Sequence, residues 1–198
     1  HTEEGLKSGK LRSCGRATRV CEIRIVDEND EDVQRGEVGH IIVRGPITML
    51  GYWNKPDVTA STLKDGWVYT GDAGYMDEDG FIFLMDRLKD MIVSGGENVY
   101  STEVENALSQ HPEVATSAVI GIPHEKWGES VHAIVIFKPG MSASEQELKD
   151  HCHTLIAGYK CPQSVSFRED PFPLSGANKV LKTELHKEFW EGQERTIN

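Results

Sequence analysis

Three polar side chains combine a reactive residue type with a setting that suits a phosphorylated ligand. Asp72 follows Thr70-Gly71 at the predicted end of a strand, where its carboxylate could accept two hydrogen bonds from a vicinal diol such as a ribose. Arg87 could contact a ribose or a phosphate, and Lys179, in a loop of small residues, could stabilise charge that develops in a transition state. Local sequence alone favours a structural interpretation for each: a turn aspartate, a surface arginine and a solvated lysine.

A glycine turn and a tryptophan are the other candidates for a binding site. The Ser-Gly-Gly turn that ends at Gly96 could cradle a ligand through its backbone, or it could be an ordinary turn. Trp127 stands in a polar loop, either as a stacking surface or as an apolar plug. The turn does not fit the phosphate-loop pattern of NTPases, and the eight histidines show no zinc-binding spacing, so we expect no metal site on this chain.

The stretch 86–105 must position several of these residues. It passes from alternating charges through the apolar residues 91–93 to the glycine turn, and it then enters a predicted helix at Ser101 or Thr102. Thr102 and Glu105 have the spacing of a capping box, which predicts that the helix begins there.

Upstream of this stretch, short alternating runs separated by turn residues predict a small, mostly antiparallel β unit. Gly71-Asp72 is predicted to break its third strand. The predicted elements are strands at 19–26, 40–44 and 67–70, a short helix at 57–63, and a hairpin that joins 74–76 to 81–84.

Downstream of this stretch, helices alternate with strands in a pattern that predicts a compact α+β domain. Gly158 is expected to end the second of these helices. The predicted elements are a helix at 102–110, strands at 114–122 and 130–137, a helix from Ser142 or Ser144 to about Ala157, a strand at 164–168 and a helix at 183–190. The predicted fold class is therefore α+β, with a β subdomain at 1–88 and a second domain at 89–198 that begins at Lys89.

Composition limits the classes of partner. The net charge of −11 argues against a nucleic-acid partner and against a polybasic membrane contact, and no apolar run approaches the roughly 20 residues of a membrane span. The four cysteines include no C-x-x-C pair, which favours reduced thiols and a cytoplasmic location. The first 15 residues have no initiating methionine and read as a loop, so we expect a fragment of a longer protein.

Several motifs in one order and register give a more specific indication. They lie at residues 36–39, 51–54, 69–72, 86–105, 158–162 and 173–179. On these motifs, the chain resembles the C-terminal third of an adenylate-forming enzyme, of the superfamily that contains acyl-CoA synthetases, peptide-synthetase adenylation domains and firefly luciferase. The resemblance extends from about Gly15 to the end and outweighs the structural interpretation of the single residues. It implies the last subdomain of a large AMP-binding domain, followed by a small C-terminal lid domain.

The resemblance also implies a reaction and its main residues. A carboxylic acid and MgATP would give an acyl-adenylate, which CoA would convert to a thioester. By position, Asp72 would hold the ribose hydroxyls of ATP, and Arg87 would assist there. Lys179 would be the catalytic lysine, in contact with the carboxylate and the α-phosphate during adenylation.

Three further roles follow from the same resemblance. Lys89 falls on the hinge about which the lid domain rotates, and Gly96 and Trp127 fall where CoA-using members line the pantetheine channel. The chain departs from some relatives at Cys161 and Gln163, which occupy positions where those relatives place basic residues near the CoA nucleotide.

We therefore expect a fragment of an ATP-dependent carboxylic acid–CoA ligase for a fatty or aromatic acid, which uses ATP, CoA and Mg²⁺. Because the implied phosphate loop and magnesium ligands lie outside this chain, we expect the chain alone to fold but to be inactive. Two alternatives stay open: a peptide-synthetase-type adenylation domain, and a noncatalytic module that binds a nucleotide or CoA. A homodimer of the full-length form also stays open.

Overall fold

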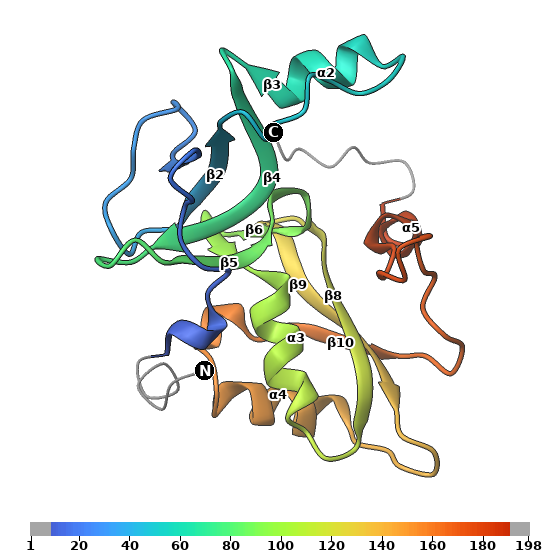
Figure 1. Ribbon diagram of the computed structural model, residues 1–198. Coiled ribbons are helices and arrows are strands. Elements are labelled where there is room, and N and C mark those ends of the chain that lie inside the picture. Colours follow the sequence, from blue (N-terminus) through green and yellow to red (C-terminus); the bar gives the residue numbers. More distant parts are fainter. Residues whose placement is uncertain (1–8, 191–198) are drawn as a thin grey trace. The chain divides into compact units, whose positions relative to one another are not determined.

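The computed structural model describes residues 9–190 and divides the chain into two compact units, residues 1–88 and 89–198. Each unit contains a five-stranded sheet and short helices, so the predicted α+β class is confirmed (Figure 1). The division lies between Leu88 and Lys89. That the first unit is the last subdomain of a larger domain stays a prediction.

The first unit is built on an antiparallel sheet with β4 at its centre. On one side β4 pairs with β2, which pairs with β1, and on the other side β3 and β5 pair with its two ends. Its elements are η1 (Lys10–Arg12), β1 (Glu22–Val26), β2 (Gly39–Arg44), α2 (Pro56–Thr62), β3 (Leu63–Lys64), β4 (Trp67–Met76) and β5 (Ile82–Arg87), and η2 (Leu88–Asp90) leads into the second unit.

The predicted break at Gly71-Asp72 is wrong, because β4 continues through both residues. His40 pairs with Ala73 whereas Ile42 pairs with Tyr69, so the register with β2 shifts in between. Gly71 has a φ of 75° at this point. The glycine with positive φ therefore produces a β-bulge and does not end the strand, because β4 pairs with β2 both before and after it.

The second unit is organised around β9, which has neighbours on both edges. β8 pairs antiparallel with β9 over almost its whole length, β10 pairs parallel with residues 132–135, and β6 pairs at Gly128. Its elements are β6 (Ile92–Ser94), β7 (Glu97–Val99), α3 (Ser101–Ser109), β8 (Val114–His124), β9 (Gly128–Phe137), α4 (Glu145–His153), η3 (Gly158–Lys160), β10 (Ser164–Phe167) and α5 (Lys182–Lys187).

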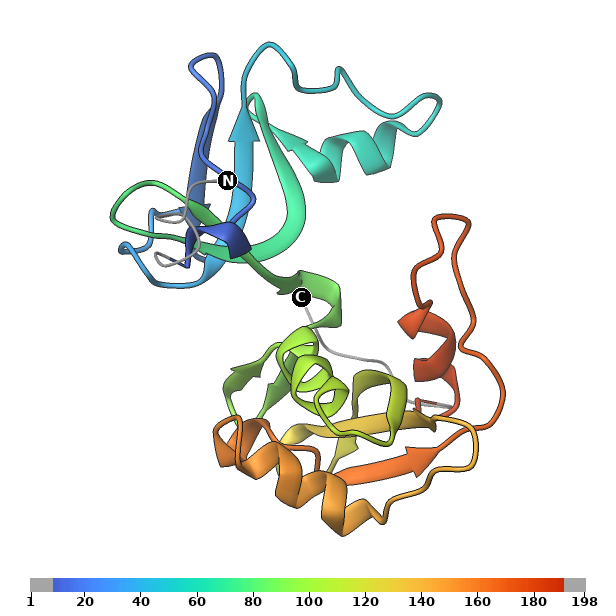
Figure 2. The ribbon, with the colours of Figure 1, turned by 60° about the horizontal axis from the view of Figure 1, so that its bottom comes forward.

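Both faces of this second sheet are covered. α3 and α4 lie against each other and close one core, which includes Val119 and Val131 from the strands and Leu148 from α4 (Figure 2). Successive residues of a strand point to opposite faces, so Ile120 faces a second core with Leu185 of α5. The near-continuous apolar runs of β8 and β9 follow from this double burial.

The helix boundaries correct several predictions. Ser144 and Glu147 form the capping box that begins α4, whereas the cap predicted at Thr102 is wrong, because Tyr100 is the N-cap of α3 and has no side-chain cap hydrogen bond. α4 ends at His153 rather than near Ala157, and Gly158 begins a 3₁₀ turn instead of ending the helix. The last helix is also shorter than predicted.

Candidate functional site

Asp72 and Arg87 lie directly opposite each other on β4 and β5. Their side chains form an ion pair in which Arg87 Nε is 3.4 Å from Asp72 Oδ1, and both remain accessible, at 50% and 37% exposure. An exposed pair of this kind contributes at most about 1 kcal/mol, so a ligand can rearrange it at little cost. The arrangement offers a carboxylate for a diol beside a guanidinium for a phosphate.

The bulge in β4 fixes the backbone at Asp72. The Asp72 N–H donates to Thr70 Oγ1 at 3.1 Å, and the Thr70 hydroxyl donates to the Ile41 carbonyl oxygen at 2.8 Å. A Cβ placed on Gly71 would lie 3.9 Å from a guanidinium nitrogen of Arg87. The irregular segment therefore brings the Asp72 carboxylate and the Arg87 side chain to one place on the sheet.

Lys179 is exposed at the end of a closed loop in the second unit. The Ser175 N–H donates to the Lys179 carbonyl at 2.8 Å, and the Lys179 N–H donates to Ser175 Oγ at 3.2 Å. Leu174 and Val180 form an antiparallel bridge just outside this loop. The backbone of the loop is therefore held by its own hydrogen bonds, while the lysine side chain extends into solvent.

The glycine turn that ends at Gly96 joins β6 to β7. Gly95 and Gly96 have φ values of 62° and 87°, the pattern of a two-residue hairpin turn with positive φ at both positions. The Gly95 N–H donates to the Trp127 carbonyl at 3.0 Å, and the indole lies 3.6 Å from a Cβ built on Gly95. A Cβ on Gly96 would meet nothing within 4 Å. The structure thus brings the two predicted CoA-binding residues together and leaves open backbone at Gly96.

Trp127 is a surface side chain rather than an apolar plug. It is 37% exposed and stacks on the His124 ring, with centroids 4.4 Å apart and planes 11° apart. His124 Nδ1 accepts hydrogen bonds from the Lys126 and Trp127 N–H groups, each at 3.2 Å. The indole face is therefore held in a defined orientation and remains accessible to a ligand.

A buried carboxylate lies close to the glycine turn. Glu129 is only 5% exposed, and its Oε2 accepts a hydrogen bond from the Val93 N–H at 3.1 Å. A Cβ on Gly121 would lie 2.5 Å from that same oxygen, so the glycine in β8 provides the space for the carboxylate. The sequence analysis did not single out Glu129, because a glutamate in a polar loop-to-strand junction carries no local signal of burial.

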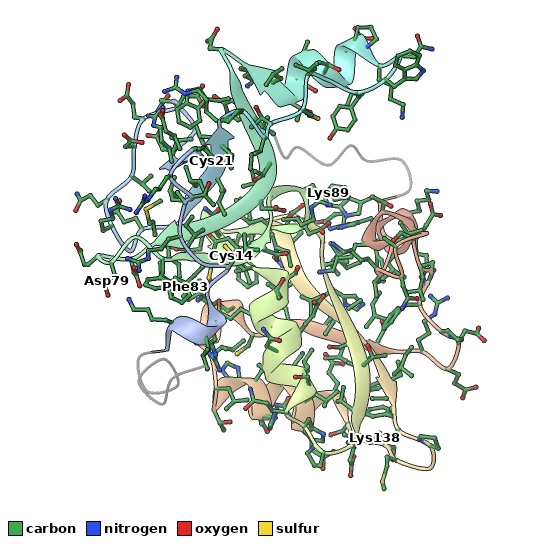
Figure 3. The ribbon with its side chains drawn as sticks, viewed as in Figure 1. Cys14, Cys21, Asp79, Phe83, Lys89 and Lys138 are labelled. Atoms are coloured by element: carbon green, nitrogen blue, oxygen red, sulfur yellow. The ribbon has the colours of Figure 1, made fainter. Side chains whose placement is uncertain are left out.

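Lys89 lies in η2, directly after the division between the two units, and its side chain is labelled in Figure 3. Asp72 and Arg87 belong to the first unit, and Gly96, Trp127 and Lys179 to the second. The link at Lys89 is therefore a single short turn of backbone, and its role as a hinge stays a prediction.

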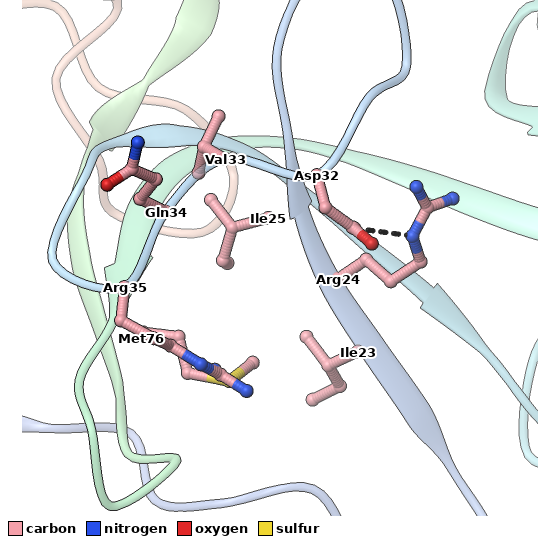
Figure 4. A pocket seen from close by; sticks show the side chains of 8 residues that line it. All are labelled: Ile23, Arg24, Ile25, Asp32, Val33, Gln34, Arg35 and Met76. Atoms are coloured by element: carbon pink, nitrogen blue, oxygen red, sulfur yellow. Dashed lines mark hydrogen bonds and ion pairs between the residues drawn. The ribbon is translucent and has the colours of Figure 1, made fainter.

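The first unit also contains a pocket that the sequence analysis missed (Figure 4). Its volume is about 230 Å³, and an ion pair between Arg24 and Asp32, at 2.6 Å, lies on its wall. It is lined by Ile23, Arg24, Ile25, Asp32, Val33, Gln34, Arg35 and Met76. None of the predicted site residues lines it.

Within residues 9–190, no group of three or more His, Cys, Asp or Glu side chains is arranged to hold a metal ion. None of the helices there is long and apolar enough to cross a membrane.

The sequence matches two protein-family models. The model of the AMP-binding enzyme C-terminal domain matches residues 103–179, and the model of the AMP-binding enzyme matches residues 2–53. A long-chain-fatty-acid–CoA ligase of Yersinia pestis is 46% identical over 176 residues, which make up 89% of this chain and 31% of the relative. A fatty acid–acyl-carrier-protein ligase of Streptomyces coeruleorubidus is 43% identical over 175 residues, which make up 88% of this chain and 34% of the relative.

A solved structure shows the same fold. The o-succinylbenzoate CoA synthetase from Bacillus subtilis, in complex with its acyl-adenylate intermediate, is similar with a TM-score of 0.85 and 37% sequence identity. The similarity covers 93% of this chain and 37% of that chain. The chain therefore spans about a third of the length of the curated relatives that it matches.

Proposed function

We propose, from the premise that this chain belongs to the AMP-binding enzymes, that the protein carrying it is an ATP-dependent ligase that joins a carboxylic acid to coenzyme A. The observation that carries the proposal is the closed, exposed loop that presents Lys179. The relatives described above act, by their names, on fatty acids or on o-succinylbenzoate. A fatty or aromatic acid is therefore the substrate class that we propose.

The proposed reaction has two steps. In the first, a carboxylate oxygen of the acid attacks the α-phosphorus of ATP, and pyrophosphate leaves with the electrons of the broken P–O bond. Lys179 stabilises the negative charge that develops around that phosphorus. In the second, the CoA sulfur attacks the carbonyl carbon of the acyl-adenylate, the thiol loses its proton, and AMP leaves to give the thioester.

The residues of the first unit would hold the nucleotide. The Asp72 carboxylate accepts hydrogen bonds from the two ribose hydroxyls, and Arg87, 3.4 Å away, contributes donors to the ribose or a phosphate. Mg²⁺ would be bound with the ATP phosphates, since phosphate and carboxylate oxygens are its ligands. Because residues 9–190 contain no group of side chains arranged to hold a metal ion, its protein ligands would come from outside this chain.

The residues of the second unit would serve both steps. Gly96 offers backbone without a side chain, and Trp127 offers an oriented indole face, which together suit the narrow, partly apolar pantetheine arm of CoA. Lys179 and these two residues serve different steps. Rotation about Lys89 between the steps would present each set in turn, since such motions concentrate their φ/ψ change in a few residues at element ends.

The test is Lys179→Ala in the full-length protein, with pyrophosphate release and thioester formation measured separately. Removing one positioned donor at developing charge costs about 10²–10³ in rate, so adenylation should slow by that factor. Thioester formation from preformed acyl-adenylate should change much less. Lys187→Ala is the control, because Lys187 is exposed and pairs with Glu184 on its own helix.

Two results would contradict the proposal. Equal losses in both half-reactions would show that Lys179 supports the fold or both steps. Absence of acid-dependent pyrophosphate release from the full-length wild type would favour the noncatalytic nucleotide- or CoA-binding module.

One observation supports a second acceptor for the acyl group, an acyl-carrier protein in place of CoA. The relative from Streptomyces coeruleorubidus is named as a ligase for an acyl-carrier protein, whose thiol ends the same kind of pantetheine arm. Supplying the enzyme with either CoA or a carrier protein that bears phosphopantetheine distinguishes the two. We expect saturable thioester formation with CoA; formation with the carrier protein alone would establish the second function instead.

A further inference from the structure

Lys182, at the start of α5, makes a partly buried polar cluster with the start of α3. Its Nζ lies 2.7 Å from Glu105 Oε1 and 2.5 Å from Ser101 Oγ. The side chains of Lys182 and Glu105 are 11% and 24% exposed, and Ser101 is fully buried. A charge held this far from solvent requires its partner, since removing one member leaves the other uncompensated.

Glu105 connects this cluster to the sheet as well as to α3. Its Oε1 also accepts a hydrogen bond from the Val119 N–H of β8, at 2.8 Å. Lys182 is therefore fixed to an oxygen that is itself held by β8. The backbone next to Lys182 is pinned too, because the Leu181 N–H donates to the Pro173 carbonyl at 2.8 Å.

The cluster lies close in sequence to the loop that presents Lys179. Only Val180 and Leu181 separate Lys179 from Lys182. The hydrogen bonds within the loop define its shape, but they do not connect it to the rest of the unit. On the C-terminal side of the loop, Val180 packs against the core that contains Ile120 and Leu185, and the Lys182 cluster adds a polar connection to α3 and β8.

We propose that Lys182 is a positioning residue for Lys179, and that it acts by tethering the Lys179 loop to α3 and β8 through Glu105 and Ser101. This role rests on the proposed adenylation function. A displacement of about 1 Å at a reacting group can cost about 10²-fold in rate, so loss of the tether has a kinetic consequence even if the fold survives.

The first experiment compares Lys182→Met with Lys187→Met in the full-length protein. Both substitutions remove an ammonium group from α5, but Lys187 is 70% exposed and pairs with Glu184 on its own helix. We expect Lys182→Met to lower the kcat of adenylation by about 10²-fold while the KM values for ATP and acid change little, because a misplaced group is felt mainly in the transition state. Lys187→Met should retain wild-type kinetics, and Lys182→Arg, which keeps the charge, should recover part of the loss.

The second experiment separates positioning from general stabilisation. If Lys182 acts through Lys179, Lys182→Met should have almost no further effect on adenylation in a Lys179→Ala background. A decrease of the adenylation rate by the same factor in both backgrounds would overturn the proposal. An unchanged kcat in the single Lys182→Met variant would overturn it as well.

Hydrogen exchange provides a test that does not depend on activity. The amides of Ser175, Asn178 and Lys179 close the loop, and the Leu181 amide closes its base. Lys182→Met should speed exchange at these amides and leave the amides of β8 and β9 protected. Unchanged loop exchange would reject the tether. An inactive wild type would reject the proposed function and, with it, the catalytic role of the tether, but faster loop exchange would still establish the tether as structural.

Discussion

The two units bury their apolar side chains to very different extents. In the first unit Ile25, Ile41 and Ile82 form one buried cluster, and Val26, Ile42 and Ala73 are buried as well, whereas the second unit has two clusters, one on each face of its sheet. Leu50 and Trp53 of the first unit are 98% and 96% exposed. Since burial contributes about 25 cal/mol per Å² of apolar surface, the second unit gains far more of its stability from its own residues.

Because of this difference, the proposed site residues of the two units are held in place in different ways. Lys179 and its tether belong to a unit whose sheet is covered on both faces. Asp72 and Arg87 belong to a unit in which Leu50 and Trp53 are almost fully exposed, whereas the exposed large apolar side chains described in the second unit reach at most 54%. An exposed apolar patch commonly marks contact with another protein surface. The lysine end of the proposed site is therefore self-contained, and we expect the nucleotide end to depend on further packing.

Separate expression of the two units should produce the largest effect. Residues 89–198 should unfold cooperatively on heating, whereas residues 1–88 should lack a cooperative transition, because their core is too small to offset the conformational entropy of the chain. Circular dichroism of each fragment measures this. A cooperative transition of residues 1–88 at the temperature of the intact chain would remove the proposed difference.

Substitution of one leucine in each unit tests the same comparison in the intact chain. Leu148→Ala deletes a side chain that is 0% exposed in the core beneath α4, and it should lower the free energy of unfolding by about 2–5 kcal/mol. Leu50→Ala removes a side chain that is 98% exposed and should change stability by no more than about 0.5 kcal/mol. Similar losses from both substitutions, measured by urea denaturation, would show that Leu50 is packed in solution.

A proline at the link between the units tests whether they must reorient. Lys89→Pro fixes φ near −65° and disfavours the helical conformation of Leu88, which lies in the 3₁₀ turn η2. In the full-length protein we expect adenylation to survive within about tenfold, or 1.4 kcal/mol, while conversion of the adenylate to the thioester falls by more than about 10². Both half-reactions are measured by single-turnover kinetics on one preparation.

Lys89→Ala is the control for loss of the side chain alone. If it reproduces the effect of Lys89→Pro, or if Lys89→Pro slows both halves equally, the backbone hinge should be abandoned.

The smallest predicted effect concerns a buried histidine of the second unit. His132 is 4% exposed, and its two ring nitrogens lie 2.7 Å and 3.0 Å from the hydroxyls of Ser164 and Ser166. Burial lowers the pKa of His132 below its ordinary value of 6.5, although the charge of Glu145 partly opposes this. Between the two pKa values the unfolded chain binds the proton more readily, so the stability of the unit should fall as pH decreases below 6.5 and level off below the folded-state pKa.

Titration of this one group should change the free energy of unfolding by at most about 1.4 kcal/mol per pH unit. It is measured as the pH dependence of the unfolding free energy between pH 5 and 7, with His132→Gln as the variant that cannot titrate. An identical pH dependence in the variant would assign the effect to other groups.

Local signals predicted much of the fold, and tertiary contacts explain where they failed. Ser144 and Glu147 form their capping box, whereas Glu105, at the same spacing from Thr102, is engaged by Lys182 and by the Val119 N–H. The two motifs look alike in the sequence. They differ in the contacts that residues far away in the sequence make with the glutamate.

The candidate site residues had recognisable sequence signals, whereas the residues that hold them in place did not. Asp72, Arg87 and Lys179 stand in recognisable motifs, and the ion pair between the first two follows from the hairpin of β4 and β5. Lys182 and Glu129 had no such signal, because their partners lie far away in the sequence. The strand at 164–168 was predicted, but its parallel pairing with β9 was not, because local periodicity does not identify the partner strand.

The contact between Ser101 and Lys182 joins residues 81 positions apart, which has a consequence for synthesis of the protein. Translation delivers α3 and the central strands first, and domains fold as units when their last residues emerge. Glu105 then lacks the Lys182 ammonium group until the segment with Lys182 has left the ribosome. We expect α3 to be cleaved by a protease in nascent chains from which Lys182 has not yet emerged, and to become resistant once that segment has emerged.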